Sequence, residues 1–257
     1  MTAIADAATL AGRDLLRLWR QPVWIFVTLV QPVVWLLLFG ALFERVVDIP
    51  GFEGGDYQQY IVPGVLVMTA FFSSGWSGMA TIEDLERGIT DRLLVTPVRR
   101  WPLIAGRVGQ NLVQLVIQSV IIVALALVTG VTFDGGVLGV AALILLAGLL
   151  GTAFAALSNA LALVTRTEES LIGAVSFLQL PLTFLSTAFM QPALMPDWMA
   201  KAADFNPVDW AISGGREAVQ AGTDWATVAG YAGLLAAFAL AALALATRAF
   251  RAYQAQV

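Results

Sequence analysis

The stretch Thr81–Trp101, TIEDLERGITDRLLVTPVRRW, is a charged island between two long apolar runs. Its ionisable residues are Glu83, Asp84, Glu86, Arg87, Asp91, Arg92, Arg99 and Arg100. Only 12% of the 257 residues are charged, so this island is where a mostly apolar chain can bind a partner in water.

The spacing within the island predicts a hinge between helices. Thr81 and Asp84 resemble a capping box, and Gly88 can adopt the left-handed conformation that ends a helix. A short helix is then expected to restart and to stop at Pro97, with residues 93–95 as its apolar side. We expect this short helix to lie across one membrane face.

The composition indicates an integral membrane protein, because 59% of the residues are hydrophobic and the charged fraction is about half that of a soluble domain. The chain has no cysteine and no histidine, which excludes disulfides and Cys/His metal sites. We therefore predict no metal site. No basic, aromatic-rich patch indicates nucleic-acid binding.

Six charge-free runs are each long enough to cross a hydrocarbon core, which needs about 20 helical residues. The predicted fold is an all-α integral membrane domain over residues 1–257. Its elements are an N-terminal interfacial helix at 5–20, transmembrane helices at 22–43, 58–80, 105–129, 137–163, 170–190 and 226–246, a coupling segment at 81–101, and short external helices at 191–224.

The basic residues predict the orientation of this domain. With both termini, the charged island and the turn at Arg166 on one side, eleven of the fourteen Lys and Arg residues fall there. Arg45, Lys201 and Arg216 remain on the other side. Cytoplasmic loops carry the excess of basic residues, so both termini and the island are expected in the cytoplasm.

The island contains the sequence ERGITDRLLVTPVRR, which resembles a signature of the permease subunits of ABC-2 type exporters, in particular their drug-resistance branch. The resemblance implies a coupling helix that docks on a separate ATP-binding subunit. The implied contact residues are Glu86, Arg87, Gly88, Asp91, Arg92, Leu93, Leu94, Thr96 and Pro97. A polar loop without a partner is the alternative interpretation of the same residues.

A second resemblance covers residues 196–217. In the family, an Asn-Pro pair and a downstream Arg, here Asn206, Pro207 and Arg216, belong to short re-entrant or external helices. The alternative is that Asn206-Pro207 forms a simple turn and that Trp198 and Trp210 are interfacial aromatic residues. The resemblance also implies a bacterial inner-membrane location and pairing with a second permease copy or a related permease.

No ATP site is present in this chain, because a P-loop needs G-x-x-x-x-G-K-[ST] and Lys201 is the only lysine. We predict no cofactor here and assign ATP and Mg²⁺ to the partner subunit. A proton relay is disfavoured, since the six runs lack ionisable residues. A membrane-embedded enzyme is disfavoured for want of clustered acids, bases or metal ligands.

A path for an apolar or amphipathic substrate would need aromatic walls and a few neutral hydrogen-bonding groups. The candidate path residues are Trp35, Phe71, Phe72, Gln179 and Phe184. The predicted function is export of drug-like or antibiotic-like hydrophobic compounds. A permease for a lipid or glycan precursor and an ion-coupled secondary transporter are the alternatives.

Two polar stripes also run along predicted membrane helices. Gln110, Gln114 and Gln118 are spaced by four residues, with Asn111 beside them, and Thr69, Ser73 and Ser77 show the same spacing. Residues four apart lie on one helix face. We interpret these stripes as interhelical hydrogen-bonding groups, with substrate contact as the alternative.

Overall fold

The computed structural model describes residues 22–42, 57–87 and 101–254. Its longer helices are α2 (Pro22–Leu42), α3 (Tyr57–Gly75), α4 (Met79–Glu86), α6 (Trp101–Val128), α7 (Gly136–Thr165), α8 (Glu168–Phe184), α10 (Pro207–Val219) and α11 (Trp225–Gln254). The shorter ones are the 3₁₀ turns η2 (Trp76–Gly78) and η3 (Pro192–Leu194) and the helix α9 (Asp197–Ala203). No strand occurs within the described ranges.

Four segments among the described residues are long and apolar enough to cross a membrane: Tyr57–Glu86, Gly109–Val128, Gly136–Thr165 and Trp225–Tyr253. The expected count of six spans is not confirmed, because α2 counts only as a shorter apolar helix over Pro32–Leu42 and α8 is not among the candidate spans. The predicted interfacial helix at 5–20 lies outside the described residues.

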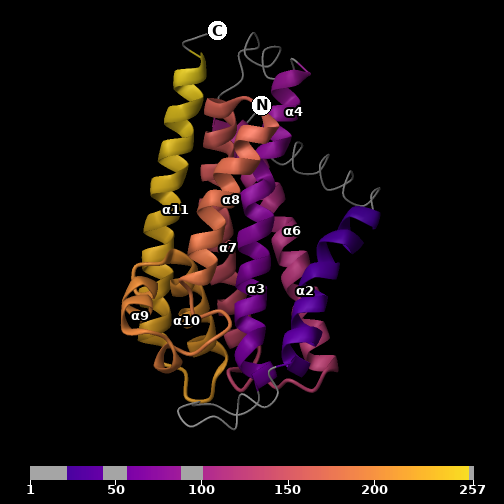
Figure 1. Cartoon of the computed structure of the whole chain (residues 1–257), viewed down its shortest axis with the longest axis vertical. Helices are drawn as coiled ribbons and strands as arrows, with labels where there is room; N and C mark the ends of the chain where they lie inside the picture. The colour runs from indigo at the N-terminus through magenta and orange to yellow at the C-terminus, as the bar shows by residue number, and fades with distance from the viewer. Residues whose placement is uncertain (1–21, 43–56, 88–100, 255–257) are drawn as a thin grey trace.

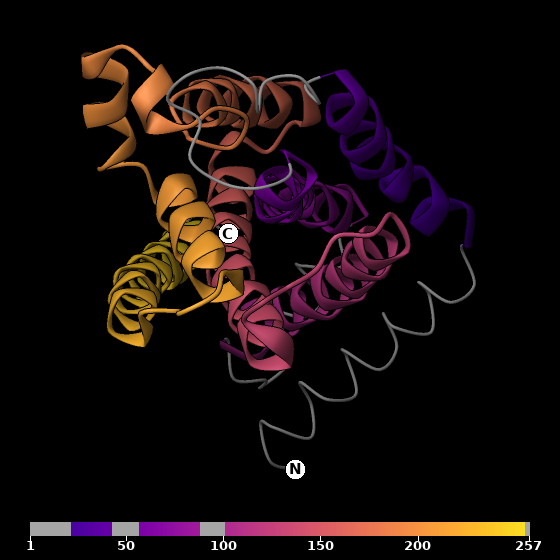
Figure 2. The ribbon, with the colours of Figure 1, turned by 90° about the horizontal axis from the view of Figure 1, so that it is seen from below.

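Helix α7 stands in the middle of the bundle and packs against α3, α6, α8, α10 and α11. Viewed along the bundle, α3 and α7 are central, while α2, α6, α8 and α11 surround them (Figure 2). Small residues allow the closest of these contacts, since Ala153 and Ala156 of α7 meet Ala239, Ala242 and Ala246 of α11. Small side chains let membrane helices approach closely and gain dispersion contacts.

The outer surface of the bundle is apolar. Val137, Phe177 and Leu240 are 89%, 81% and 68% exposed, on helices α7, α8 and α11. So many large apolar side chains facing outward are unfavourable in water and suit a hydrocarbon environment. This surface is that of a multi-pass membrane protein.

Helices α3 and α4 form one continuous rod that runs through the 3₁₀ turn η2 (Figure 1). The predicted helix start at Thr81 is therefore wrong. Thr81 lies inside α4, and its hydroxyl donates a hydrogen bond to Asn159 Oδ1 of α7. The Thr81 hydroxyl therefore bonds to Asn159 of another helix and does not cap the start of α4.

The 3₁₀ turn is held by polar groups of α7. Ser158 Oγ accepts a hydrogen bond from the backbone N of Gly78 at 2.9 Å and donates one to the carbonyl of Gly75. Asn159 Nδ2 donates to Ser77 Oγ at 3.1 Å. A Cβ on Gly78 would lie 2.5 Å from the Ser158 carbonyl, so this crossing requires glycine.

Helix α8 ends at Phe184, so it is shorter than the predicted span 170–190. Residues 185–191 are not helical and cross α3 at Gly64, where a Cβ would lie 2.6 Å from the Ala188 carbonyl. Asn206 Nδ2 donates to the carbonyls of Leu182 and Leu185 at 2.7 and 3.0 Å. These bonds satisfy carbonyls that a helix end leaves without partners.

The region predicted as short external helices contains η3, α9 and α10. Asn206 is the N-cap of α10, because its Oδ1 accepts from the backbone N of Val208 at 3.0 Å and Pro207 follows as the first helical residue. Helix α10 does not lie free at the surface. It packs against α7, α3 and α11, and a Cβ on Gly139 of α7 would lie 2.1 Å from the Ala218 carbonyl.

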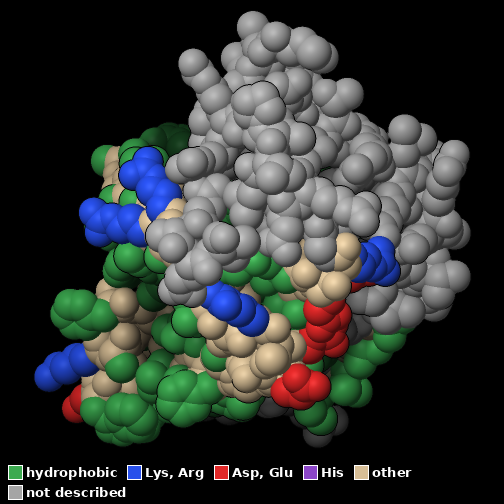
Figure 3. Space-filling view, turned by 90° about the horizontal axis from the view of Figure 1, so that it is seen from above, with side chains coloured by type: hydrophobic (Ala, Val, Ile, Leu, Met, Phe, Trp, Pro, Cys, Tyr) green, Lys and Arg blue, Asp and Glu red, His purple; other side chains and the backbone are tan. Residues whose placement is uncertain are grey.

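The two ends of the bundle differ in their charged residues. The end of α4, the α7–α8 turn and the C-terminal end of α11 lie together at one end (Figure 1) and bring Arg87, Arg166 and Arg251 there. Figure 3 shows basic and acidic side chains on this end. Lys201 and Arg216 belong to α9 and α10, at the opposite end.

Candidate functional site

A cavity of about 480 Å³ lies between α2, the α3–η2–α4 rod and α6. The described residues that line it are Pro32, Trp35, Met68, Thr69, Phe72, Ser73, Trp76, Ser77, Met79, Ala80, Gln110, Asn111, Gln114 and Gln118. None of these is ionisable. The volume falls within the range of about 300–1,000 Å³ that is typical of small-molecule sites.

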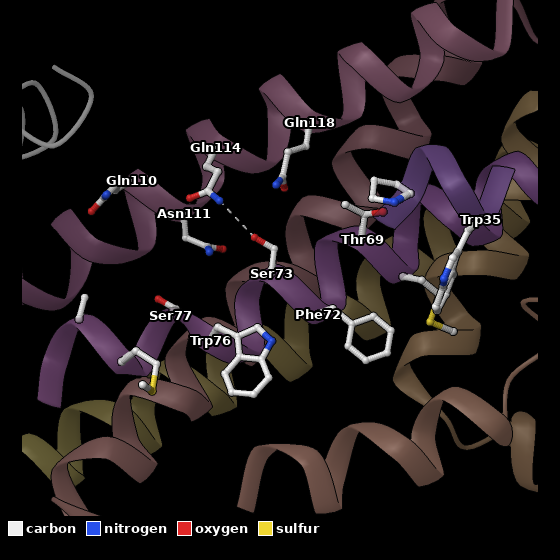
Figure 4. A pocket seen from close by; sticks show the side chains of 14 residues that line it. Trp35, Thr69, Phe72, Ser73, Trp76, Ser77, Gln110, Asn111, Gln114 and Gln118 are labelled. Atoms are coloured by element: carbon white, nitrogen blue, oxygen red, sulfur yellow. Dashed lines mark hydrogen bonds between the residues drawn. The ribbon is translucent and has the colours of Figure 1, made fainter. Parts of the chain in front are cut away.

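One wall of the cavity is a row of side-chain amides on α6 (Figure 4). The four-residue spacing of Gln110, Gln114 and Gln118 places them on one helix face. Gln114 Nε2 donates to Ser73 Oγ of α3 at 3.5 Å, a long contact. Asn111 Oδ1 accepts from Ser74 Oγ at 3.0 Å, so two of the amides reach the rod.

Gln118 differs from the other amides of this wall. The residue is 3% exposed, and neither Nε2 nor Oε1 has a hydrogen-bond partner in the described part of the chain. Leaving a buried amide unsatisfied costs about 1–3 kcal/mol. Gln118 belongs to the cavity wall, and its amide, covered by the surrounding protein, is a donor and an acceptor of this wall that no described residue uses.

The other wall is aromatic and sulfur-containing. The ring of Trp35 on α2 meets Phe72 of α3 edge to face, with centroids 6.1 Å apart, and meets Phe189 at 5.4 Å. Trp76 is 40% exposed and shares the cavity with Met68. The cavity therefore combines flat apolar faces with neutral hydrogen-bonding groups.

Only some of the predicted path residues line the cavity. Trp35 and Phe72 line the cavity. Phe71 points into the core, where its ring centroid lies 4.5 Å from that of Phe154. Gln179 is buried and donates to the Phe71 carbonyl at 3.1 Å, and Phe184 is 68% exposed at the end of α8. The last three residues do not line the cavity.

Several lining residues were absent from the predicted path, notably Met68, Trp76 and the amides of α6. For the amides, the available signal was the four-residue spacing of their stripe on α6, which we interpreted as interhelical hydrogen bonding with substrate contact as the alternative. The structure shows the interhelical bonds of Gln114 and Asn111 to α3, while the Gln118 amide has no partner among the described residues.

Only the beginning of the predicted coupling contact is described. Glu86 and Arg87 are exposed at the end of α4, and Arg87 Nη2 lies 2.5 Å from Glu83 Oε1, one helical turn earlier. An exposed pair of this kind contributes at most about 0.5 kcal/mol. Gly88, Asp91, Arg92, Leu93, Leu94, Thr96 and Pro97 lie outside the described residues.

A second polar cluster lies at the opposite end of the bundle, where Arg216 of α10 holds the non-helical segment. Its Nη1 donates to Thr187 Oγ1 at 3.0 Å, and its Nη2 donates to the carbonyls of Thr187 and Ala188 at 2.7 and 3.1 Å. The guanidinium carbon lies 3.7 Å from the centroid of the Tyr60 ring. Part of the Arg216 residue stays exposed, but these contacts enclose its guanidinium.

Asp209 completes this cluster. Its Oδ1 accepts from the backbone N and from Oγ1 of Thr187, at 2.7 and 2.6 Å, and its Oδ2 accepts from Ser213 Oγ at 3.1 Å. Burial lowers the pKa of Arg216, while Tyr60 and Asp209 act in the opposite direction. Thr187 thus links a carboxylate to a guanidinium, and the cluster fixes residues 185–191 against α3.

No group of three or more potential metal ligands of the His, Cys, Asp or Glu type occurs among the described residues. A helical bundle with an apolar outer surface and a cavity lined by uncharged residues is typical of a membrane transport permease. Comparison with protein families agrees with this class. Residues 6–219 match the model of the ABC-2 type transporter family, and the chain therefore belongs to that family.

The chain aligns with individual relatives over most of its length. It is 29% identical over 217 residues to the daunorubicin resistance ABC transporter permease protein DrrB1 of Streptomyces coeruleorubidus, covering 82% of this chain and 76% of the relative. It is 34% identical over 215 residues to the putative transport permease ycf38 of Cyanophora paradoxa, covering 81% and 72%. It is 29% identical over 213 residues to the inner membrane transport permease YadH of Escherichia coli (strain K12), covering 78% and 76%.

Proposed function

We propose that this chain is the transmembrane subunit of an ATP-driven exporter that moves hydrophobic or amphipathic, drug-like compounds out of the cytoplasm or the inner leaflet. The observation that carries the proposal is the continuous rod from Tyr57 to Glu86. Its middle forms one wall of the cavity, and its end leads directly into the charged island. Motion applied at the island would therefore be transmitted along a helix to the cavity.

The energy source in this proposal is a separate ABC ATP-binding subunit, which binds ATP and Mg²⁺. The coupling contact comprises Glu86, Arg87 and the island residues that follow them, with charged side chains setting the register and Leu93 and Leu94 filling an apolar groove. A second permease copy, or a related permease, completes the pathway. The relative DrrB1, a daunorubicin resistance permease, supports the drug-like substrate class.

The experiment that tests this proposal is to tag the chain, extract it gently from its native membrane and identify the co-purifying proteins by mass spectrometry. We expect a stoichiometric P-loop ATPase and, after reconstitution in vesicles, transport that requires ATP. An ion-coupled transporter would instead lose transport with an ionophore and keep it without ATP. Absence of an ATPase even after cross-linking would contradict the proposal.

We further propose that both termini and the island face the cytoplasm of a bacterial inner membrane. Since the chain has no cysteine, single cysteines report topology without background. Lys201 of α9 and Arg251 of α11 are both exposed and lie at opposite ends of the bundle. In intact spheroplasts, a membrane-impermeant maleimide should label Lys201→Cys, and it should label Arg251→Cys only after permeabilisation. The reverse pattern would overturn the orientation.

A further inference from the structure

We propose that the cavity between α2, α3 and α6 binds an apolar molecule that carries an amide, or another adjacent pair of one hydrogen-bond donor and one acceptor, and that Gln118 recognises this group. The inference rests on the transport role proposed above and specifies the class of substrate. Its basis is the lining amide whose donor and acceptor are both buried and have no hydrogen-bond partner within the described residues.

The chemistry of Gln118 selects the ligand group. A side-chain amide offers two N–H donors and a carbonyl acceptor, so it can form two hydrogen bonds with a ligand whose N–H and C=O lie on the same edge, as in a lactam or a primary amide. With the Gln118 side chain turned toward the cavity, Nε2 donates to the ligand carbonyl, and Oε1 accepts from the ligand N–H. The neighbouring amides are less available, because Asn111 accepts from Ser74 and Gln114 approaches Ser73.

The remainder of the cavity selects for an apolar and uncharged body. Trp35, Phe72 and Met68 provide flat or adaptable apolar contacts. No ionisable side chain is present among the described lining residues. A carboxylate or phosphate would lose its hydration there without gaining a counter-ion, so anionic ligands are disfavoured.

Trapped water is the competing occupant of this site. A polar cavity of this volume has room for several waters, each of which needs two to four polar partners. If water already satisfied both atoms of Gln118, replacing that residue by an apolar one would leave the water short of partners and destabilise the empty protein. If the amide is unsatisfied, the same replacement stabilises the empty protein.

The test uses the full-length permease, purified in lipid nanodiscs, and two radiolabelled probes of similar shape. 2-Quinolinone is a lactam with its N–H and C=O on the same edge of two fused rings, while 2-methylnaphthalene has the same shape and no polar group. We expect the wild type to bind 2-quinolinone about tenfold more tightly than 2-methylnaphthalene, after subtraction of binding to empty nanodiscs. Gln118→Leu should abolish this preference and raise the melting temperature of the empty protein.

Gln114→Leu is the matched control, since Gln114 lines the same cavity one helical turn away, and it should keep the preference for 2-quinolinone. Gln118→Met replaces Gln118→Leu if the latter does not fold. Equal binding of the two probes, no binding of either, a preference retained without the Gln118 amide, or a lowered melting temperature would each overturn the inference.

These measurements need neither ATP nor an ATPase. If the co-purification experiment found no ATPase, the proposed function would fail while the probe preference remained. If the preference were absent while ATP-driven transport persisted, this inference alone would fail.

Discussion

Replacing Leu93 and Leu94 together by aspartate should abolish association with the ATP-binding subunit and eliminate ATP-dependent transport. Under the proposed function, both leucines insert into an apolar groove of the partner. Burying a leucine contributes about 1.5–3 kcal/mol, and a carboxylate in the same groove would add a desolvation cost. The loss in affinity should therefore exceed about 100-fold.

The measurement is a pull-down of the ATPase with the tagged permease, accompanied by thermal unfolding of the permease alone. The variant should remain in the membrane with an unchanged melting temperature, because the island lies outside the apolar runs. Leu93→Met with Leu94→Met is the matched control and should preserve association, since methionine keeps the apolar volume. Normal association of the aspartate variant would show that the island is not the docking contact.

The substitution Asp209→Ala should destabilise the protein by about 3–5 kcal/mol, because hydrogen bonds to a charged group contribute about 1.5–3 kcal/mol each. It removes the acceptor of two hydrogen bonds from Thr187 and one from Ser213, and it removes the carboxylate that favours the charged form of the enclosed Arg216 guanidinium. Residues 185–191 would then lose part of their attachment to α3. We expect the melting temperature to fall by about 10 °C.

Two comparisons make this result specific. Asp204→Ala changes an exposed carboxylate in the same connection and should leave the melting temperature nearly unchanged. The double variant Asp209→Ala, Arg216→Met removes both charges and should be less destabilised than the sum of the two single variants. A fall of less than about 2 °C for Asp209→Ala alone would mean that the cluster does not fix the segment.

The membrane class was predictable from the sequence for a simple physical reason. Hydrocarbon excludes charged side chains, so runs without Asp, Glu, Lys or Arg mark helices that cross it. The charged island and the Asn206-Pro207 pair are short motifs that can be recognised within a few residues of sequence. The island therefore predicted the family, and the Asn206-Pro207 pair lies at the start of α10.

The site depended on contacts between segments that are distant in the chain. Phe71 and Phe72 are neighbours, yet consecutive helical residues point about 100° apart, so one enters the core against Phe154 and the other lines the cavity. Which residue does which depends on where α7 and α2 pack. The sequence of α3 alone therefore does not show which of the two phenylalanines lines the cavity.

Composition and hydropathy thus predicted a helical membrane protein, and the resemblance of the island to a family signature predicted the permease class, while the sequence contains no P-loop motif. Tertiary structure decided where α8 ends, because Arg216 reaches Thr187 and Ala188 only when α10 packs beside α3. It also decided that Gln118 lies in a cavity wall without a hydrogen-bond partner among the described residues. The physical reason is that hydrophobicity and helix periodicity act within one segment, whereas the pairing of polar groups requires two segments to meet.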